Sequence, residues 1–126
     1  MATLMRRRGL APEIVTGHDF RSYSETVKRA LVSGLKTAGL VVHDLGLCLS
    51  PAAYFAQSHL HVAALAMVTA SHNENGWTGL KLATEPGLTF EPCDMAELRD
   101  ITFAGHWPEA RPAATASMPA PPLAPT

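Results

Sequence analysis

The sequence is poor in cysteine: Cys48 and Cys93 are the only two among its 126 residues. We also expect no secretory signal, because Arg6-Arg7-Arg8 is followed by Gly-Leu-Ala-Pro-Glu and not by an apolar segment. Two cysteines in a chain without an export signal are typical of reduced thiols in a reducing compartment. We therefore expect two free thiols and a cytoplasmic protein.

The sequence has neither an excess of charge of one sign nor a long apolar run. Ten Lys and Arg residues nearly balance eleven Asp and Glu residues, for a net charge of −1. This balance gives no electrostatic basis for binding nucleic acid or an anionic membrane. The apolar run at residues 62–68 is far shorter than the ~20 residues that span a bilayer. We expect partners that are neither nucleic acid nor membrane.

Apolar periodicity predicts an α/β fold. Val27, Leu31 and Leu35 recur at helical spacing, as expected for a helix that packs on a sheet. A strand, a crossover of helical length and a second strand favour a parallel pair with a right-handed connection. We expect a three-layer α/β/α domain with a small mixed, mainly parallel sheet. The predicted strands are 13–17, 40–46, 62–68 and 80–83, and the predicted helices are 2–8, 24–38, 50–59 and 92–104.

Polar and special residues set the expected helix boundaries. Ser24 and Ser50 precede apolar helical patterns, and each is predicted to be an N-cap. Pro51 suits the first position of a helix, and Gly39 suits the end of one.

The composition changes after Trp107. Residues 108–126 are mostly Pro and Ala and show no apolar periodicity. Such a segment cannot build a packed core. We therefore predict one folded unit at residues 1–107 and a disordered tail at residues 108–126, which is either a Pro/Ala linker or the product of a shifted reading frame.

Residues 69–81, Thr-Ala-Ser-His-Asn-Glu-Asn-Gly-Trp-Thr-Gly-Leu-Lys, are rich in small and polar side chains. They follow the buried strand at 62–68, so Ser71 is expected at its carboxyl end, the edge where open α/β sheets bind ligands. A hydroxyl at Ser71, polar neighbours at His72 and Asn73, and a cation at Lys81 are suited to handling phosphate.

This stretch resembles the phosphoserine loop of the α-D-phosphohexomutases, the phosphomannomutase and phosphoglucomutase family. The resemblance lies in residues 69–73 (Thr-Ala-Ser-His-Asn) and 75–81 (Asn-Gly-Trp-Thr-Gly-Leu-Lys). It extends upstream through residues 17–21 (Gly-His-Asp-Phe-Arg) and 45–47 (Leu-Gly-Leu), and covers roughly residues 4 to 104. That range corresponds to most of the first of four family domains.

The resemblance implies a reaction and a set of site residues. It identifies Ser71 as the phosphorylated serine, which gives its phosphoryl group to a hexose 1- or 6-phosphate and takes one back from the bisphosphate intermediate. Lys81 matches the lysine that assists proton transfer, and His72, Asn73 and Arg21 match residues that approach the substrate or phosphate. Mg²⁺ is the implied cofactor, bound here through the phosphate of Ser71, and the implied substrates are mannose or glucose phosphates.

The chain departs from the family by what it does not contain. The aromatic-Asp-x-Arg-Gly motif of the first strand and the Asp-x-Asp-x-Asp-Arg metal loop are absent from the sequence. We therefore expect a fragment, incomplete at both ends, that has no mutase turnover alone. The alternatives are an inactive remnant or interaction module that meets the other domains in trans, and a free-standing phosphosugar-binding domain.

Other motifs point to no further chemistry. His59 and His61 have no Cys or acidic partner at a credible spacing, so no zinc site is assigned. Ser71 lacks the Gly-x-Ser-x-Gly pattern of a serine-hydrolase elbow.

Overall fold

A computed structural model describes residues 1–105 of the chain, and the tail predicted at residues 108–126 lies outside them. The described part alternates helices and strands, in agreement with the predicted order. The elements are α1 (Ala2–Arg7), β1 (Glu13–His18), α2 (Ser24–Thr37), β2 (Val41–Leu47), α3 (Ser50–His59), β3 (Ala64–Val68), β4 (Leu80–Ala83) and α4 (Pro92–Ala104).

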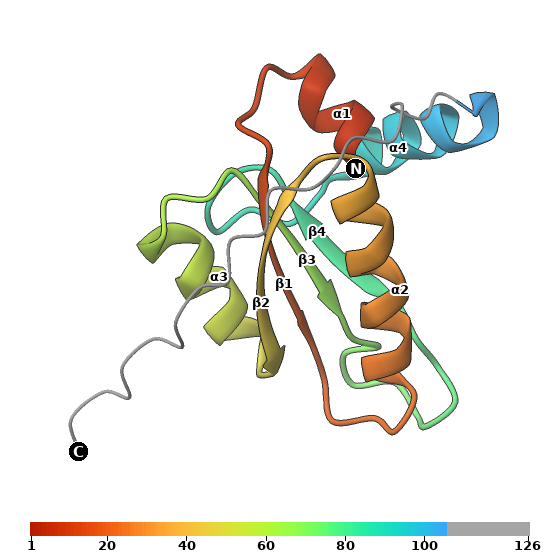
Figure 1. The fold of residues 1–126 in the computed structure, drawn as a ribbon. Coiled ribbons are helices and arrows are strands. Elements are labelled where there is room, and N and C mark those ends of the chain that lie inside the picture. The colour runs from red at the N-terminus through yellow and green to blue at the C-terminus, as the bar shows by residue number, and fades with distance from the viewer. Residues whose placement is uncertain (106–126) are drawn as a thin grey trace.

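The four strands form one sheet in the order β2-β1-β3-β4 (Figure 1). β1 pairs in parallel with β2 and with β3, whereas β4 runs antiparallel to β3. The sheet is therefore mixed and mainly parallel, as predicted. Because β4 reverses direction, its first residues lie at the same edge of the sheet as the carboxyl ends of the other three strands.

Helices cover both faces of this sheet, with α2 on one side and α3 on the other (Figure 1). Successive residues of a strand point to opposite faces, so neighbouring strand residues join different cores. Ile14, Ala66 and Leu82 pack on the face with α2 and α1, and Val15, Leu65 and Met67 pack on the face with α3. These two apolar layers confirm the three-layer α/β/α architecture.

The structure corrects two predicted helix caps. α2 begins at Ser24 itself, and the hydroxyl of Ser24 donates to the carboxylate of Asp19 instead of accepting from a backbone N–H of the helix. α3 likewise begins at Ser50, with Leu49 at the cap position. Gly39 follows α2 with φ of 90°, a left-handed conformation that suits glycine, so the predicted end of this helix is confirmed.

Both cysteines are free, as predicted: Cys48 is half-buried and Cys93 is exposed. Within residues 1–105, no helix combines the length and the apolar character needed to cross a membrane.

Candidate functional site

The predicted site residues come from two loops and one strand at a single edge of the sheet (Figure 1). The loop between β1 and α2 carries Arg21, and the loop between β3 and β4 carries Ser71, His72 and Asn73. Lys81 is the second residue of β4 and pairs with Met67 of β3. The sequence therefore predicted correctly that these residues gather where the parallel strands end.

Ser71 is exposed and adopts an unusual backbone conformation. Its φ is 57°, in the left-handed region that costs a residue with a side chain about 1–2 kcal/mol. Two side chains hold this backbone: the N–H of Ser71 donates to Thr69 Oγ1 over 3.0 Å, and its carbonyl accepts from Arg21 Nη2 over 3.2 Å. A strained residue fixed by its surroundings is a frequent feature of functional sites.

The carboxylate of Asp19 is the centre of the hydrogen-bond network behind Ser71. It is buried and accepts from Ser24, from Thr69 and from both the backbone and the side chain of Arg21. Burial raises the pKa of Asp19, but these hydrogen bonds favour the ionised form more strongly and lower the pKa to about 2. Asp19 therefore supplies a permanent negative charge that holds Arg21 in place.

Arg21 lies against the loop and not in open solvent. Its side chain is 5% exposed and forms an ion pair with Asp19. Nη2 donates to the backbone carbonyl oxygens of Ser71, over 3.2 Å, and Asn73, over 2.6 Å. These contacts link the β1–α2 loop to the β3–β4 loop. Direct contact between Arg21 and a phosphate stays a prediction.

His72 and Asn73 have different positions in the loop. The Nδ1 atom of His72 lies 3.4 Å from Ser71 Oγ, and both side chains are exposed. The side-chain amide of Asn73 donates to the carbonyl of Ala70 over 2.7 Å, and so does its backbone N–H, over 3.1 Å. Asn73 thus closes a tight turn around Ser71, whereas the imidazole of His72 is the group beside the hydroxyl.

Sequence reasoning missed Asp19, Thr69 and Tyr23 as parts of this site. The hydroxyl of Tyr23 accepts from the N–H of Gly76 over 3.0 Å and donates to the carbonyl of Trp77. These partners lie more than 50 residues away from Tyr23 along the chain, so no local pattern indicates the contact.

The described residues do not form a magnesium site by themselves. The family that the Ser71 loop resembles is generally magnesium dependent, yet residues 1–105 contain no cluster of three or more His, Cys, Asp or Glu side chains able to hold a metal ion. The carboxylate in the site's hydrogen-bond network, Asp19, is already engaged by Arg21 and by two hydroxyl groups.

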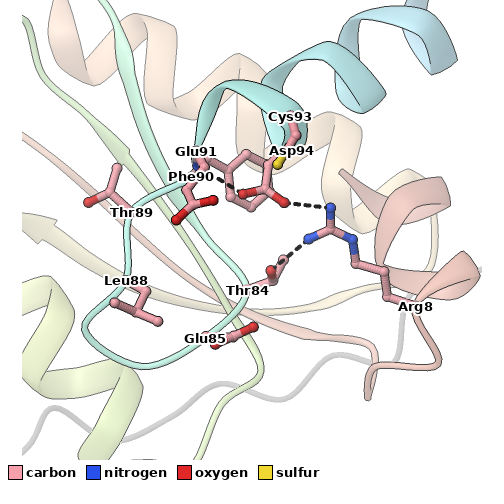
Figure 2. A pocket seen from close by; sticks show the side chains of 9 residues that line it. All are labelled: Arg8, Thr84, Glu85, Leu88, Thr89, Phe90, Glu91, Cys93 and Asp94. Carbon is pink, nitrogen blue, oxygen red and sulfur yellow. Dashed lines mark hydrogen bonds and ion pairs between the residues drawn. The ribbon is translucent and has the colours of Figure 1, made fainter.

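A pocket of about 240 Å³ lies at the opposite edge of the sheet, where β4 ends and α4 begins (Figure 2). Arg8 lies on one side of it and donates to Thr84, to Asp94 and to Glu97. Its guanidinium also lies 5.6 Å from the ring centre of Phe90. Arg8 therefore joins the end of α1 to β4 and α4, far from Ser71 in the fold.

Comparison with known proteins agrees with the α/β/α fold and with the resemblance of the Ser71 loop. Residues 1–109 match the family described as phosphoglucomutase/phosphomannomutase, alpha/beta/alpha domain I. A phosphoglucomutase/phosphomannomutase of Thermococcus kodakarensis is 34% identical over 110 residues, which are 86% of this chain and 24% of that protein. A phosphomannomutase of Salmonella montevideo is 37% identical over 105 residues, which are 82% of this chain and 23% of that protein.

A probable phosphoglucosamine mutase of Thermococcus gammatolerans is 38% identical over 94 residues, or 75% of this chain and 21% of that protein. The crystal structure of a phosphoglucomutase/phosphomannomutase family protein from Burkholderia thailandensis has the same fold, with a TM-score of 0.78 at 24% identity over 90% of this chain and 26% of that one. The chain thus spans about a quarter of the length of these relatives. It belongs to the phosphoglucomutase/phosphomannomutase family, and the part that it shares with the family is the α/β/α domain I.

Proposed function

We propose that this chain carries the phosphoryl-transfer serine of a phosphohexomutase, which interconverts hexose 1-phosphates and hexose 6-phosphates through a bisphosphate intermediate. Ser71 is the phosphoryl carrier in this proposal. The observation that supports it best is the exposed hydroxyl of Ser71 on a backbone whose N–H and carbonyl are both held by side chains. Such a hydroxyl is accessible to a substrate and fixed in position at the ligand-binding edge of the sheet.

The proposed reaction is a phosphoryl exchange between two oxygens. When phosphorylated Ser71 meets a hexose monophosphate, a sugar hydroxyl oxygen forms a bond to phosphorus while the bond from phosphorus to Ser71 Oγ breaks. Over the whole step, the sugar hydroxyl loses its proton and Ser71 Oγ gains one, so that serine regains its hydroxyl. The reverse transfer, from the other phosphate of the bisphosphate, restores phosphorylated Ser71 and releases the isomeric monophosphate.

Lys81 and His72 are the groups of this chain that we propose to assist the exchange. Lys81 is half-buried at the start of β4, at the edge where Ser71 lies, and no ion pair within residues 1–105 engages its ammonium group. A cation there is attracted to the nearly two negative charges of a phosphoserine. Its ammonium group can give a proton to Ser71 Oγ as the bond to phosphorus breaks, and the resulting amine can take the proton of the sugar hydroxyl. His72, beside Ser71 Oγ, is suited to hydrogen bonding with the phosphoryl oxygens.

The test is phosphorylation of the full 126-residue chain with ³²P-labelled glucose 1,6-bisphosphate in a buffer that contains magnesium chloride. We expect label on Ser71, located by peptide mapping, and none on the Ser71→Ala variant. Ser33→Ala is the matched control, because Ser33 is an exposed serine of α2. Label that persists in Ser71→Ala, or an unlabelled wild-type chain, would overturn the proposal.

Whole-cycle turnover is a separate measurement. A coupled assay that follows conversion of mannose 1-phosphate separates an active mutase from a chain that carries the serine but does not complete the cycle. Steady, magnesium-dependent conversion would show that the chain works alone. Label on Ser71 without conversion would instead support the alternative in which other domains act in trans.

A further inference from the structure

The loop that carries Ser71 has a first arm, residues 71–73, and a second arm, residues 76–77. Side chains from the short loop between β1 and α2 form hydrogen bonds with both arms. Arg21 holds the first arm at the carbonyl oxygens of Ser71 and Asn73. Tyr23 holds the second arm at the N–H of Gly76 and the carbonyl of Trp77. The two clamping residues are separated by a single residue of the chain.

The first contact is anchored in the core of the fold. Asp19, which pairs with Arg21, also donates its backbone N–H to the carbonyl of Val68, the last residue of β3, over 3.0 Å. The hydroxyl of Thr69 links the same carboxylate to the N–H of Ser71. The first arm is thus fixed to the ends of β1 and β3.

The second arm returns to the sheet through Gly79, whose carbonyl accepts from the N–H of Thr69 over 3.0 Å. Among residues 1–105, however, the hydrogen bonds that reach Gly76 and Trp77 from outside the loop come from Tyr23. Residues 71–78 are all exposed, so their side chains contribute little packing. Tyr23 is half-buried at the start of α2, and its hydroxyl forms one hydrogen bond as acceptor and one as donor to this arm. A two-sided contact of this kind fixes both the distance and the orientation of the arm relative to α2.

We propose that Tyr23 is a positioning residue for phosphoryl transfer at Ser71, and that it acts together with Arg21 as the second point of a clamp. This inference rests on the proposed function. A displacement of about 1 Å at the reacting groups can lower a rate about 100-fold, and without Tyr23 the exposed Gly76–Trp77 part of the loop has that freedom. Tyr23 acts through the loop backbone and does not need to touch the substrate.

The test compares Tyr23→Phe with the wild-type chain. This change removes the hydroxyl and keeps the ring. Tyr54→Phe is the matched control, because Tyr54 is the other tyrosine of the chain and its hydroxyl contacts Thr89 near the opposite edge of the sheet. For each protein, the initial rate of Ser71 labelling is measured over a range of glucose 1,6-bisphosphate concentrations.

We expect Tyr23→Phe to lower the maximal labelling rate at least about 10-fold and to change the half-saturating concentration by less than about 2-fold. Hydrogen exchange of the Gly76 amide should become at least about 10-fold faster, with exchange of the core amide of Val15 unchanged. Tyr54→Phe should leave both labelling parameters at wild-type values.

Three results for Tyr23→Phe would overturn the inference alone: labelling with both parameters unchanged, a weaker apparent affinity with an unchanged maximal rate, or faster exchange at Val15 as well as Gly76. The second would make Tyr23 a ligand contact, and the third would make it a general stability residue. A wild-type chain without label on Ser71 overturns the proposed function and the positioning role together, so the two failures are distinguishable.

Discussion

The ammonium group of Lys28 lies 2.6 Å from Oδ2 of Asp44, joining the first half of α2 to the edge strand β2. The Lys28 side chain is 7% exposed and that of Asp44 is 35% exposed. Thr16 of β1 donates to the other carboxylate oxygen over 3.2 Å. Burial raises the pKa of Asp44, but the hydrogen bond from Lys28 and those from Gly46 and Thr16 outweigh it, so that the pKa is lowered overall.

Removing the cation of this pair should destabilise the fold. Lys28→Met keeps most of the side-chain volume but leaves the carboxylate of Asp44 without its charged partner. We expect the free energy of unfolding to fall by about 1–3 kcal/mol, less than for a fully buried pair because solvent reaches Asp44. Urea denaturation measures this change. The double variant Lys28→Met, Asp44→Asn should recover part of the loss, and a double variant no more stable than Lys28→Met would refute this account.

Asp19 should make stability depend on pH in the acid range. Its pKa in the folded protein is about 2, compared with an ordinary value of 3.8, so ionisation of Asp19 favours the folded state. This contribution, about 2 kcal/mol, is complete above pH ~4 and is lost as the pH falls from about 4 towards 2. Asp19→Asn should therefore lower stability at pH 7 and flatten the decline between pH 4 and 2, both measured by urea denaturation across pH.

Asp94→Asn is the comparison for this effect. The pKa of Asp94 is also lowered, by hydrogen bonds from the backbone of Glu91 and from Arg8, but its side chain, in the first turn of α4, is 23% exposed compared with 10% for Asp19. Its acid dependence should be weaker than that of Asp19. An Asp19→Asn variant whose stability follows the wild-type pH curve would contradict the role assigned to the buried network.

The sequence predicted the elements of this fold well because their signals are local. Apolar spacing and flanking glycine or proline placed β4 and α4 at the residues where the structure has them. The predicted caps at Ser24 and Ser50 were wrong because hydroxyl residues suit both the cap and the first turn, and a distant partner, Asp19, decided the role of Ser24. The burial of Lys28 in α2 could not be predicted from local patterns either, because its partner, Asp44, lies on β2.

The site was predictable only as a set of residues at one sheet edge. Strand direction brings Ser71 and Lys81 to that edge, and this follows from the order of the elements. The contacts of Arg21 and Tyr23 with the loop backbone join segments about 50 residues apart, and backbone carbonyl groups leave no trace in side-chain patterns. The residues expected to touch phosphate were therefore easier to identify than those that hold the loop.

Gly17 is expected to be intolerant of a side chain. A Cβ atom at this position would lie 2.6 Å from Cys48 Sγ and 3.2 Å from Met67 Sδ. Gly17→Ala should lower the free energy of unfolding by about 1–3 kcal/mol through overpacking. Combining it with Cys48→Ala should relieve much of this cost, which a double-mutant cycle measures.

Gly34→Ala is the control for this substitution. Gly34 lies in α2, and no atom is found within 4 Å of a Cβ built there. Alanine is the better helix former, so stability should rise by about 0.5–1 kcal/mol. Equal effects at Gly17 and Gly34 would mean that the contact with Cys48 does not limit the packing of β1.

Ser71→Gly should separate the stability of the loop from its proposed chemistry. Ser71 has φ of 57°, which glycine adopts without the steric cost that Cβ imposes. Part of that gain is offset because glycine makes the unfolded chain more flexible, so we expect stability to rise by about 0.5–1 kcal/mol in urea denaturation. Labelling by glucose 1,6-bisphosphate should be lost, because the acceptor oxygen is gone.

Ser33→Gly, in the exposed face of α2, should instead lose about 0.5 kcal/mol because glycine is a poor helix former. A loss of stability in Ser71→Gly as well would show that the wild-type loop holds Ser71 without strain, and would remove the argument that its backbone is constrained for function.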